Sequence, residues 1–108
     1  MLRTLLAMLL AALAGAALAG EPATFTVVMK DGRFAPPRLK VPAGKRIKLV
    51  IRNEGSGPAE FESAELRVEK VLVAGASSFV VIHRFRPGTY RFVDDFRPSG
   101  PGMPVIAK

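Results

Sequence analysis

Residues 46–52 read RIKLVIR, and apolar and polar side chains alternate along this stretch. Ile47, Leu49 and Ile51 share one face, whereas Val50 and the charged residues share the other. Successive side chains of a strand point to opposite faces of a sheet. The alternation therefore predicts a half-buried strand of the kind found in antiparallel sheets.

The chain on either side of this strand consists of short alternating runs broken by Pro and Gly. The other expected strands are residues 25–30, 39–41, 70–73, 77–83, 89–93 and 105–108. Residues 59–69 are expected to form an irregular connection with a short strand or turn of helix. No segment keeps a 3.6-residue apolar period. We therefore expect an all-β Greek-key sandwich of about seven strands.

Residues 1–19 have the features of a cleaved export signal. Arg3 precedes an apolar run at residues 5–13, and residues 17–19 (ALA) form a small-x-small cleavage motif. We expect cleavage before Gly20, a single domain over residues 20–108 and a periplasmic location. The apolar run is a poor membrane anchor because Gly15 and the cleavage motif bound it.

Composition restricts the chemistry of the mature chain. It has no cysteine, so it can form neither a disulfide nor a metal thiolate. The net charge of +7 includes Arg3, which leaves 7 − 1 = +6 for residues 20–108. This charge suits anionic lipid headgroups or an acidic partner. Nucleic acid is not an expected partner, because one Tyr and no Trp offer few surfaces for base stacking.

Several motifs occur in a defined order: residues 34–44 (FAPPRLKVPAG), a strand ending at Asn53, residues 60–63 (EFES), residues 87–90 (PGTY) and residues 95–96 (DF). This order of motifs resembles the cupredoxin family. The downstream motifs are similar to one branch, the small exported cupredoxin-like and EfeO-type proteins associated with bacterial iron uptake. This resemblance implies a two-sheet sandwich with a metal site at one end, near the loops after Asn53 and Val93.

The expected copper ligands of this family are replaced. In its electron-transfer members, a histidine stands at the position of Glu60, a cysteine at that of Asp94 and a second histidine at that of Arg97. The iron-uptake branch typically keeps histidines at the positions of Arg97 and Gly32. A blue-copper electron carrier is therefore excluded by ligand chemistry.

The remaining candidate ligands near the implied site are mostly carboxylates: Glu60, Glu62, Asp94, Asp95 and, as one soft thioether, Met103. Carboxylates suit iron or manganese better than cuprous copper. On an extended segment the two glutamates share one side and Phe61 takes the other. The alternative is that these are ordinary solvated charges. Met103, between Gly102 and Pro104, is expected to be exposed.

Arg97 supports a competing hypothesis, in which its guanidinium pairs with the carboxylates and replaces the metal. It could instead face outward and contact an anionic partner. His83 is expected to be an ordinary strand-end residue, and Met29 a core residue in phase with Val27.

No nucleophile lies in a plausible relay with a histidine, so no catalytic residue is expected. The resemblance implies a metal-handling accessory protein that binds copper or iron and works beside an iron permease. Delivery is a better expectation than catalysis, beyond at most an accessory part in ferrous-iron oxidation. The alternative is a metal-free binding module for an envelope partner, closed by Arg97.

Overall fold

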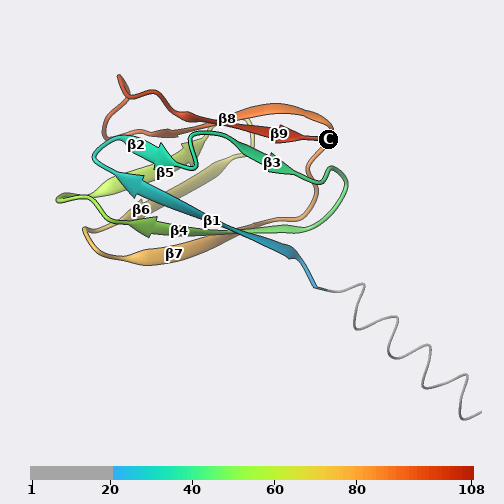
Figure 1. Ribbon diagram of the computed structural model, residues 1–108, viewed down its shortest axis with the longest axis horizontal. Coiled ribbons are helices and arrows are strands. Elements are labelled where there is room, and N and C mark those ends of the chain that lie inside the picture. The colour runs from blue at the N-terminus through green and yellow to red at the C-terminus, as the bar shows by residue number, and fades with distance from the viewer. Residues whose placement is uncertain (1–20) are drawn as a thin grey trace, which may run out of the picture.

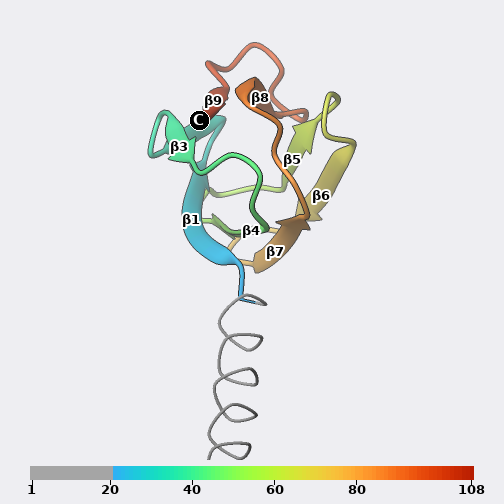
Figure 2. The same ribbon diagram turned by 90° about the vertical axis from the view of Figure 1, so that its right-hand side faces the viewer.

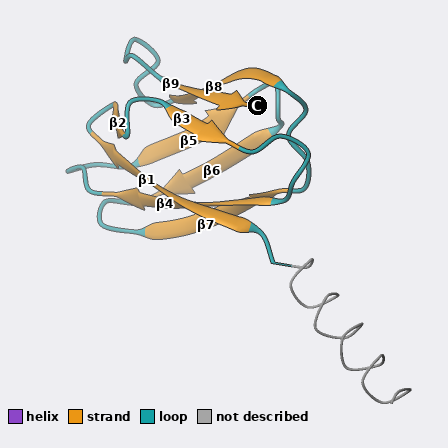
Figure 3. Cartoon of the chain, turned by 45° about the vertical axis from the view of Figure 1, so that its right-hand side comes forward, coloured by secondary structure: helices purple, strands orange, loops and turns teal. Residues whose placement is uncertain are grey.

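The computed structural model describes residues 21–108, and this part of the chain is built from strands and loops (Figure 3). The strands are β1 (Ala23–Lys30), β2 (Arg33–Ala35), β3 (Leu39–Val41), β4 (Ile47–Asn53), β5 (Ala59–Ser63), β6 (Val68–Leu72), β7 (Ser77–Ile82), β8 (Gly88–Asp94) and β9 (Met103–Ala107). Within this part, no helix has the length and apolar character needed to span a bilayer.

The strands form two sheets that face each other, as Figure 2 shows end-on. One sheet has the order β2-β1-β4-β7, and the other has the order β3-β9-β8-β5-β6. The expectation of an all-β sandwich is therefore confirmed. The loops gather at two ends, and Figure 1 shows that the chain enters β1 and leaves β9 at the same end.

The strand predicted from residues 46–52 is β4, at the centre of the first sheet. It pairs antiparallel with β7, from Ile47↔Ile82 to Arg52↔Ser77. Its other neighbour, β1, runs parallel to it, from Ala23↔Ile47 to Met29↔Asn53. The antiparallel assignment is thus right on one side and wrong on the other, because the alternation of side chains reports burial of one face and not the direction of the neighbouring strand.

The two inner faces meet in one apolar core. Ile47, Leu49 and Ile51 are fully buried, as their alternation predicts, and Met29 lies among them in the core. From the opposite sheet, the Phe61 and Phe92 rings stack with their centroids 4.4 Å apart. This stacked pair joins β5 to β8 beneath the end of the sandwich where the candidate ligands lie.

Residues 21–108 form nine strands in place of the expected seven or so. The strand β2 was missed because it has three residues between Gly32 and Pro36 and shows too short an alternation to detect. The segment 59–69, expected to be an irregular connection with a short strand or turn of helix, contains the strand β5 and the start of β6. The charged residues of this segment obscured the alternation, although Ala59, Phe61 and Ser63 form a buried inner face of β5.

The expected export signal, residues 1–19, lies outside the described residues. Among the described residues, both sheets and the core cluster lie within residues 23–107.

Truncating Phe61 tests the aromatic pair. Phe61→Ala should reduce the free energy of unfolding by about 3–5 kcal/mol, because it leaves a cavity against Phe92. Urea denaturation measures this loss. The control is Phe79→Ala, which removes a half-exposed ring on the outer face and should cost about 1 kcal/mol or less. Equal losses for the two variants would contradict the assigned core.

Candidate metal centre

Three loops meet at the end of the sandwich opposite the entry to β1: residues 31–32, 54–58 and 95–102 (Figure 1). Asn53, at the last position of β4, holds the second loop. Its buried amide nitrogen donates to the Gly57 carbonyl (2.9 Å) and to the Leu72 carbonyl (3.0 Å), and its oxygen accepts from the Gly55 N–H. This side chain fixes the loop to β6 and positions the start of β5.

Asp94, where the family places a cysteine, points into the sandwich and is 2% exposed. It lies opposite Phe61 in the β5–β8 pair and on the inner face. Its Oδ1 accepts hydrogen bonds from the N–H groups of Glu60 (3.0 Å) and Phe96 (3.1 Å). Its Oδ2 is buried and has no hydrogen-bond partner among the described residues. The charge on this oxygen must therefore be balanced by a nearby cation.

That cation is Arg97, whose Nη1 lies 3.7 Å from Asp94 Oδ2. Its Nη2 lies 4.0 Å from an oxygen of Asp31, in the turn between β1 and β2. The stem of Arg97 crosses Gly32, where a Cβ would come within 3.0 Å of the Arg97 Cδ. Arg97 thus bridges two loops above the buried carboxylate.

Asp31 is also held by the loop after β4. Its Oδ1 accepts from the N–H and from the hydroxyl of Ser56, at 3.2 and 3.3 Å. The backbone hydrogen bond from Ser56 is the main cause that lowers the pKa of Asp31, with smaller contributions from the Ser56 hydroxyl and Arg97. All three loops at this end are therefore tied together without a metal ion.

Glu60 and Glu62 lie on the opposite face of β5 from Phe61, as the extended geometry predicts. They point to the outer surface of the sheet, where Asp95 joins them. One carboxylate oxygen from each of these three residues lies within 4.8 Å of the other two. We call Glu60, Glu62 and Asp95 the outer carboxylate cluster; Glu69, opposite Glu62 on β6, flanks it.

These carboxylates repel one another. A hydrogen bond with Glu69, burial, and the charges of Glu69, Asp95 and Glu62 raise the pKa of Glu60 to about 7. Burial and the charge of Asp95 raise the pKa of Glu62. Glu60 is 7% exposed although it points outward, because its neighbours cover it. The cluster is thus an acidic site in which a cation would relieve an electrostatic cost.

The structure separates the residues that the sequence predicted as one site. Glu60, Glu62 and Asp95 come together on the outer face, whereas Asp94 lies inside with Arg97. Met103 is fully buried and lies opposite Phe92 in the core, so the expectation of an exposed thioether is wrong. Its flanking Gly102 and Pro104 do not prevent β9 from beginning at Met103 with an inward side chain.

His83 and Met29 lie where the sequence placed them. His83 is exposed just beyond β7, near Glu21 and Lys45 and at the opposite end from the cluster. Glu69 was missed, because its approach to Glu62 depends on the β5–β6 register in a segment expected to be irregular. The alternation of Val68, Lys70 and Leu72 with charged or exposed residues was the available signal.

The donor set decides which metal chemistry fits. A trigonal thiolate site does not fit, because the chain has no cysteine and Arg97 stands beside Asp94. The outer carboxylate cluster offers only oxygen ligands, which fit hard ions such as iron or manganese. Any such ion would be held by Glu60, Glu62 and Asp95.

Comparison with known proteins agrees with this architecture. The model of the cupredoxin-like domain family matches residues 2–107, so the chain belongs to that family. A relative, an uncharacterized protein of Rickettsia prowazekii (strain Madrid E), is 33% identical over 70 residues. The match covers 65% of this chain and 56% of the relative, so the chain spans little more than half of that protein.

Solved structures share the fold at low identity. Sodium-dithionite-reduced auracyanin from Roseiflexus castenholzii has a TM-score of 0.66 at 14% identity, covering 82% of this chain and 99% of its own. Auracyanin B has a TM-score of 0.68 at 19% identity, covering 82% and 91%. A purple cupredoxin from Nitrosopumilus maritimus has a TM-score of 0.57 at 16% identity, covering 77% and 98%. At this identity the similarity shows the fold alone.

The raised pKa of Glu60 gives a pH-dependent prediction for the metal-free protein. The folded state keeps the Glu60 proton up to about pH 7, while the unfolded state releases it near 4.5, so stability falls as pH rises between these values. Glu60→Gln should therefore raise the melting temperature more at pH 8 than at pH 4. The control Glu54→Gln removes a carboxylate outside the cluster and should not reproduce this difference.

Asp94 gives a second prediction. Asp94→Ala removes the acceptor of two N–H groups and should lower the free energy of unfolding by about 2–5 kcal/mol. Asp94→Asn keeps an oxygen for these donors and should cost about 1–2 kcal/mol, mainly through the lost charge near Arg97. Chemical denaturation separates the two, and equal losses would show that the hydrogen bonds contribute little.

Proposed function

We propose that this chain is an exported metal-handling accessory protein that binds iron, or a similar hard cation, at the outer carboxylate cluster. The observation that carries the proposal is the convergence of Glu60, Glu62 and Asp95 within 4.8 Å of one another. These residues come from β5 and from the loop after β8, so the folded sheet sets their spacing. A cation there would replace mutual repulsion by attraction.

The accessibility of the cluster favours delivery of an ion over catalysis. Asp95 is exposed and Glu62 is half-buried, so a bound ion would keep positions open to water or to an incoming ligand. Oxidation of ferrous iron would also need an electron acceptor. Within the described residues, cysteine is absent and the one histidine lies at the other end. An ion held by a few surface carboxylates can be passed to a partner.

The motifs of residues 60–63 and 95–96 support a role in iron uptake, since they resemble the EfeO-type branch. The two glutamates of the EFES motif and the aspartate of residues 95–96 (DF) are the three members of the cluster. The proposed partner is an iron permease or another envelope protein in the periplasm. Copper remains the second metal to be tested because it is the metal of the wider family.

Arg97 favours a second candidate function, a metal-free binding module. Its guanidinium already neutralises Asp94, at 3.7 Å, and binds Asp31 at 4.0 Å. The end of the sandwich would then serve as a rigid platform whose three loops need no ion. This candidate differs from the first in one respect: the outer carboxylates would be solvated charges without affinity for metal.

Isothermal titration of residues 20–108 with ferrous ions under anaerobic conditions, and separately with manganous and cupric ions, tests the proposal. We expect one ion per chain and a loss of at least about tenfold in affinity for Glu60→Gln or Glu62→Gln, since each variant removes a charged ligand. Binding should weaken below pH 6, where Glu60 holds a proton.

The matched control is Glu54→Gln, which removes an exposed carboxylate at the same end but outside the cluster. It should leave the affinity within about twofold of the original chain. Equal losses for Glu54→Gln and Glu60→Gln would indicate general attraction to acidic charge. Absence of binding by all three ions would favour the metal-free module.

A further inference from the structure

The end of the sandwich opposite the cluster is made from four separate segments, residues 21–23, 42–46, 83–87 and 107–108. Backbone hydrogen bonds join them. The Gly44 N–H donates to the Phe85 carbonyl (2.7 Å), the Ala43 N–H to the Lys108 carbonyl (3.4 Å) and the Ala23 N–H to the Arg46 carbonyl (3.2 Å). The Tyr90 hydroxyl donates to the Arg86 carbonyl (2.7 Å). This end is therefore one rigid surface.

Positive charge is concentrated on that surface. Its four segments carry five exposed Lys and Arg side chains and one carboxylate side chain, Glu21. The cations are Lys45, Arg46, Arg84, Arg86 and Lys108. The loops at the other end, residues 31–32, 54–58 and 95–102, carry three carboxylates and one arginine, and the cations of the adjoining strands are Lys30, Arg33 and Arg52. The molecule is thus polarised along its long direction, with a basic end, as defined by these five cations, and an acidic end.

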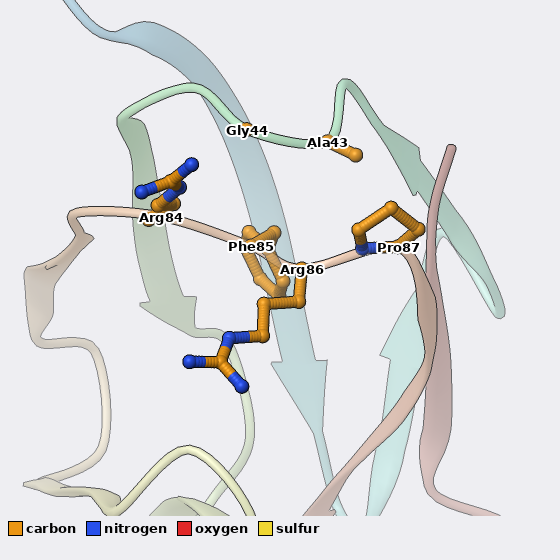
Figure 4. Close-up of a pocket in the computed structure, with 6 residues that line it drawn as sticks. All are labelled: Ala43, Gly44, Arg84, Phe85, Arg86 and Pro87. Carbon is orange, nitrogen blue, oxygen red and sulfur yellow. The ribbon is translucent and has the colours of Figure 1, made fainter.

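The cations of the basic end are spread out and do not converge. A shallow pocket of about 360 Å³ lies between Ala43, Phe85 and Pro87, with Arg84 and Arg86 beside it. Figure 4 shows the guanidinium groups of Arg84 and Arg86 on opposite sides of the loop. A site for one small anion would direct both groups to one point. Dispersed cations instead match a surface that carries many negative charges.

The basic end also lacks the apolar anchors of a protein interface. The large apolar side chains that are exposed in the described residues are Val71, Val73, Phe79 and Phe96, and none belongs to the four segments of this end. Protein interfaces generally depend on buried aromatic or aliphatic side chains at their centre. A lipid headgroup surface requires charge and no such anchor.

We propose that the basic end binds the anionic phospholipid surface of a membrane. The carboxylates of the acidic end and the loops around Arg97 then face away from the bilayer. Repulsion of the acidic end by the same lipids reinforces this orientation. The inference does not depend on metal binding, because it uses a different set of residues at the other end of the sandwich.

Co-sedimentation of residues 20–108 with vesicles tests the proposal, since this part contains both sheets and the whole core. We expect binding to vesicles containing phosphatidylglycerol, weak binding to pure phosphatidylcholine, and loss of binding at high salt. Each Lys or Arg near an anionic bilayer strengthens binding about fivefold. The triple variant Lys45→Gln/Arg84→Gln/Arg86→Gln should therefore bind about a hundredfold more weakly.

The matched control is Lys30→Gln/Arg33→Gln/Arg52→Gln, which makes the same change in net charge near the opposite end. It should retain binding within about threefold. Equal weakening of both variants would show that binding depends only on net charge and would overturn the proposal. Absence of binding to vesicles containing phosphatidylglycerol would also overturn it. Binding competed fully by millimolar inorganic phosphate would point to a small-anion site instead.

Orientation can be measured directly because the chain has no cysteine of its own. A fluorophore on Pro87→Cys, at the basic end, should be quenched by vesicles that carry a headgroup quencher. The same fluorophore on Ser99→Cys, in the loop beside Arg97, should not be quenched. Equal quenching at both positions would contradict the proposed orientation.

Discussion

The hydrogen bonds that Asp94 accepts from Glu60 and Phe96 determine how this end of the sandwich is arranged. Through Oδ1, one buried carboxylate fixes the start of β5 to the end of β8. The Asp95 N–H returns a bond to the Glu60 carbonyl at 3.0 Å. This contact fixes which side chains of β5 face inward. Phe61 stacks on Phe92, and Glu60 and Glu62 face outward. The Asp94–Arg97 pair, which we call the inner lock, and the outer carboxylate cluster therefore both result from one strand register.

In this chain, the contact that holds the loops at Asp94 and the candidate metal ligands are formed by different residues. In the electron-transfer members that the motifs resemble, the position of Asp94 supplies a cysteine to a metal at the end of the sandwich. Here it supplies a hydrogen-bond acceptor and a charge for Arg97, 3.7 Å away. The loops are consequently held by an ion-pair bridge, and the carboxylates with raised pKa lie outside it. The outer carboxylate cluster is therefore separate from the ion pair that holds the loops.

Much of the fold could be predicted from side-chain alternation alone. Ile47, Leu49 and Ile51 define the buried face of β4 without any other information, and the Pro- and Gly-rich turns separate the strands. Alternation does not reveal which strands are neighbours, and so the parallel pairing of β1 with β4 was not foreseen. Three-residue strands such as β2 carry too few side chains to show a pattern.

The candidate site was predicted in composition but not in geometry. Residue types and the family resemblance predicted Glu60, Glu62, Asp94, Asp95 and Met103 as one group of ligands, with Arg97 as a competing ion-pair partner. They could not show that Asp94 and Asp95, adjacent in sequence, point to opposite faces of the sheet. The position of Glu69 beside Glu62 depends on the β5–β6 register. The burial of Met103 depends on β9 beginning at that residue, with its side chain directed inward. Each of these facts depends on contacts between distant segments.

A crystal structure of residues 20–108 grown with manganous ions, with the ion located by its anomalous scattering, tests the central claim most directly. The account predicts one ion between the carboxylates of Glu60, Glu62 and Asp95, with Arg97 still paired to Asp94. An ion bound to Asp94 and Asp31, with Arg97 displaced, would contradict the separation of the inner lock from the outer site.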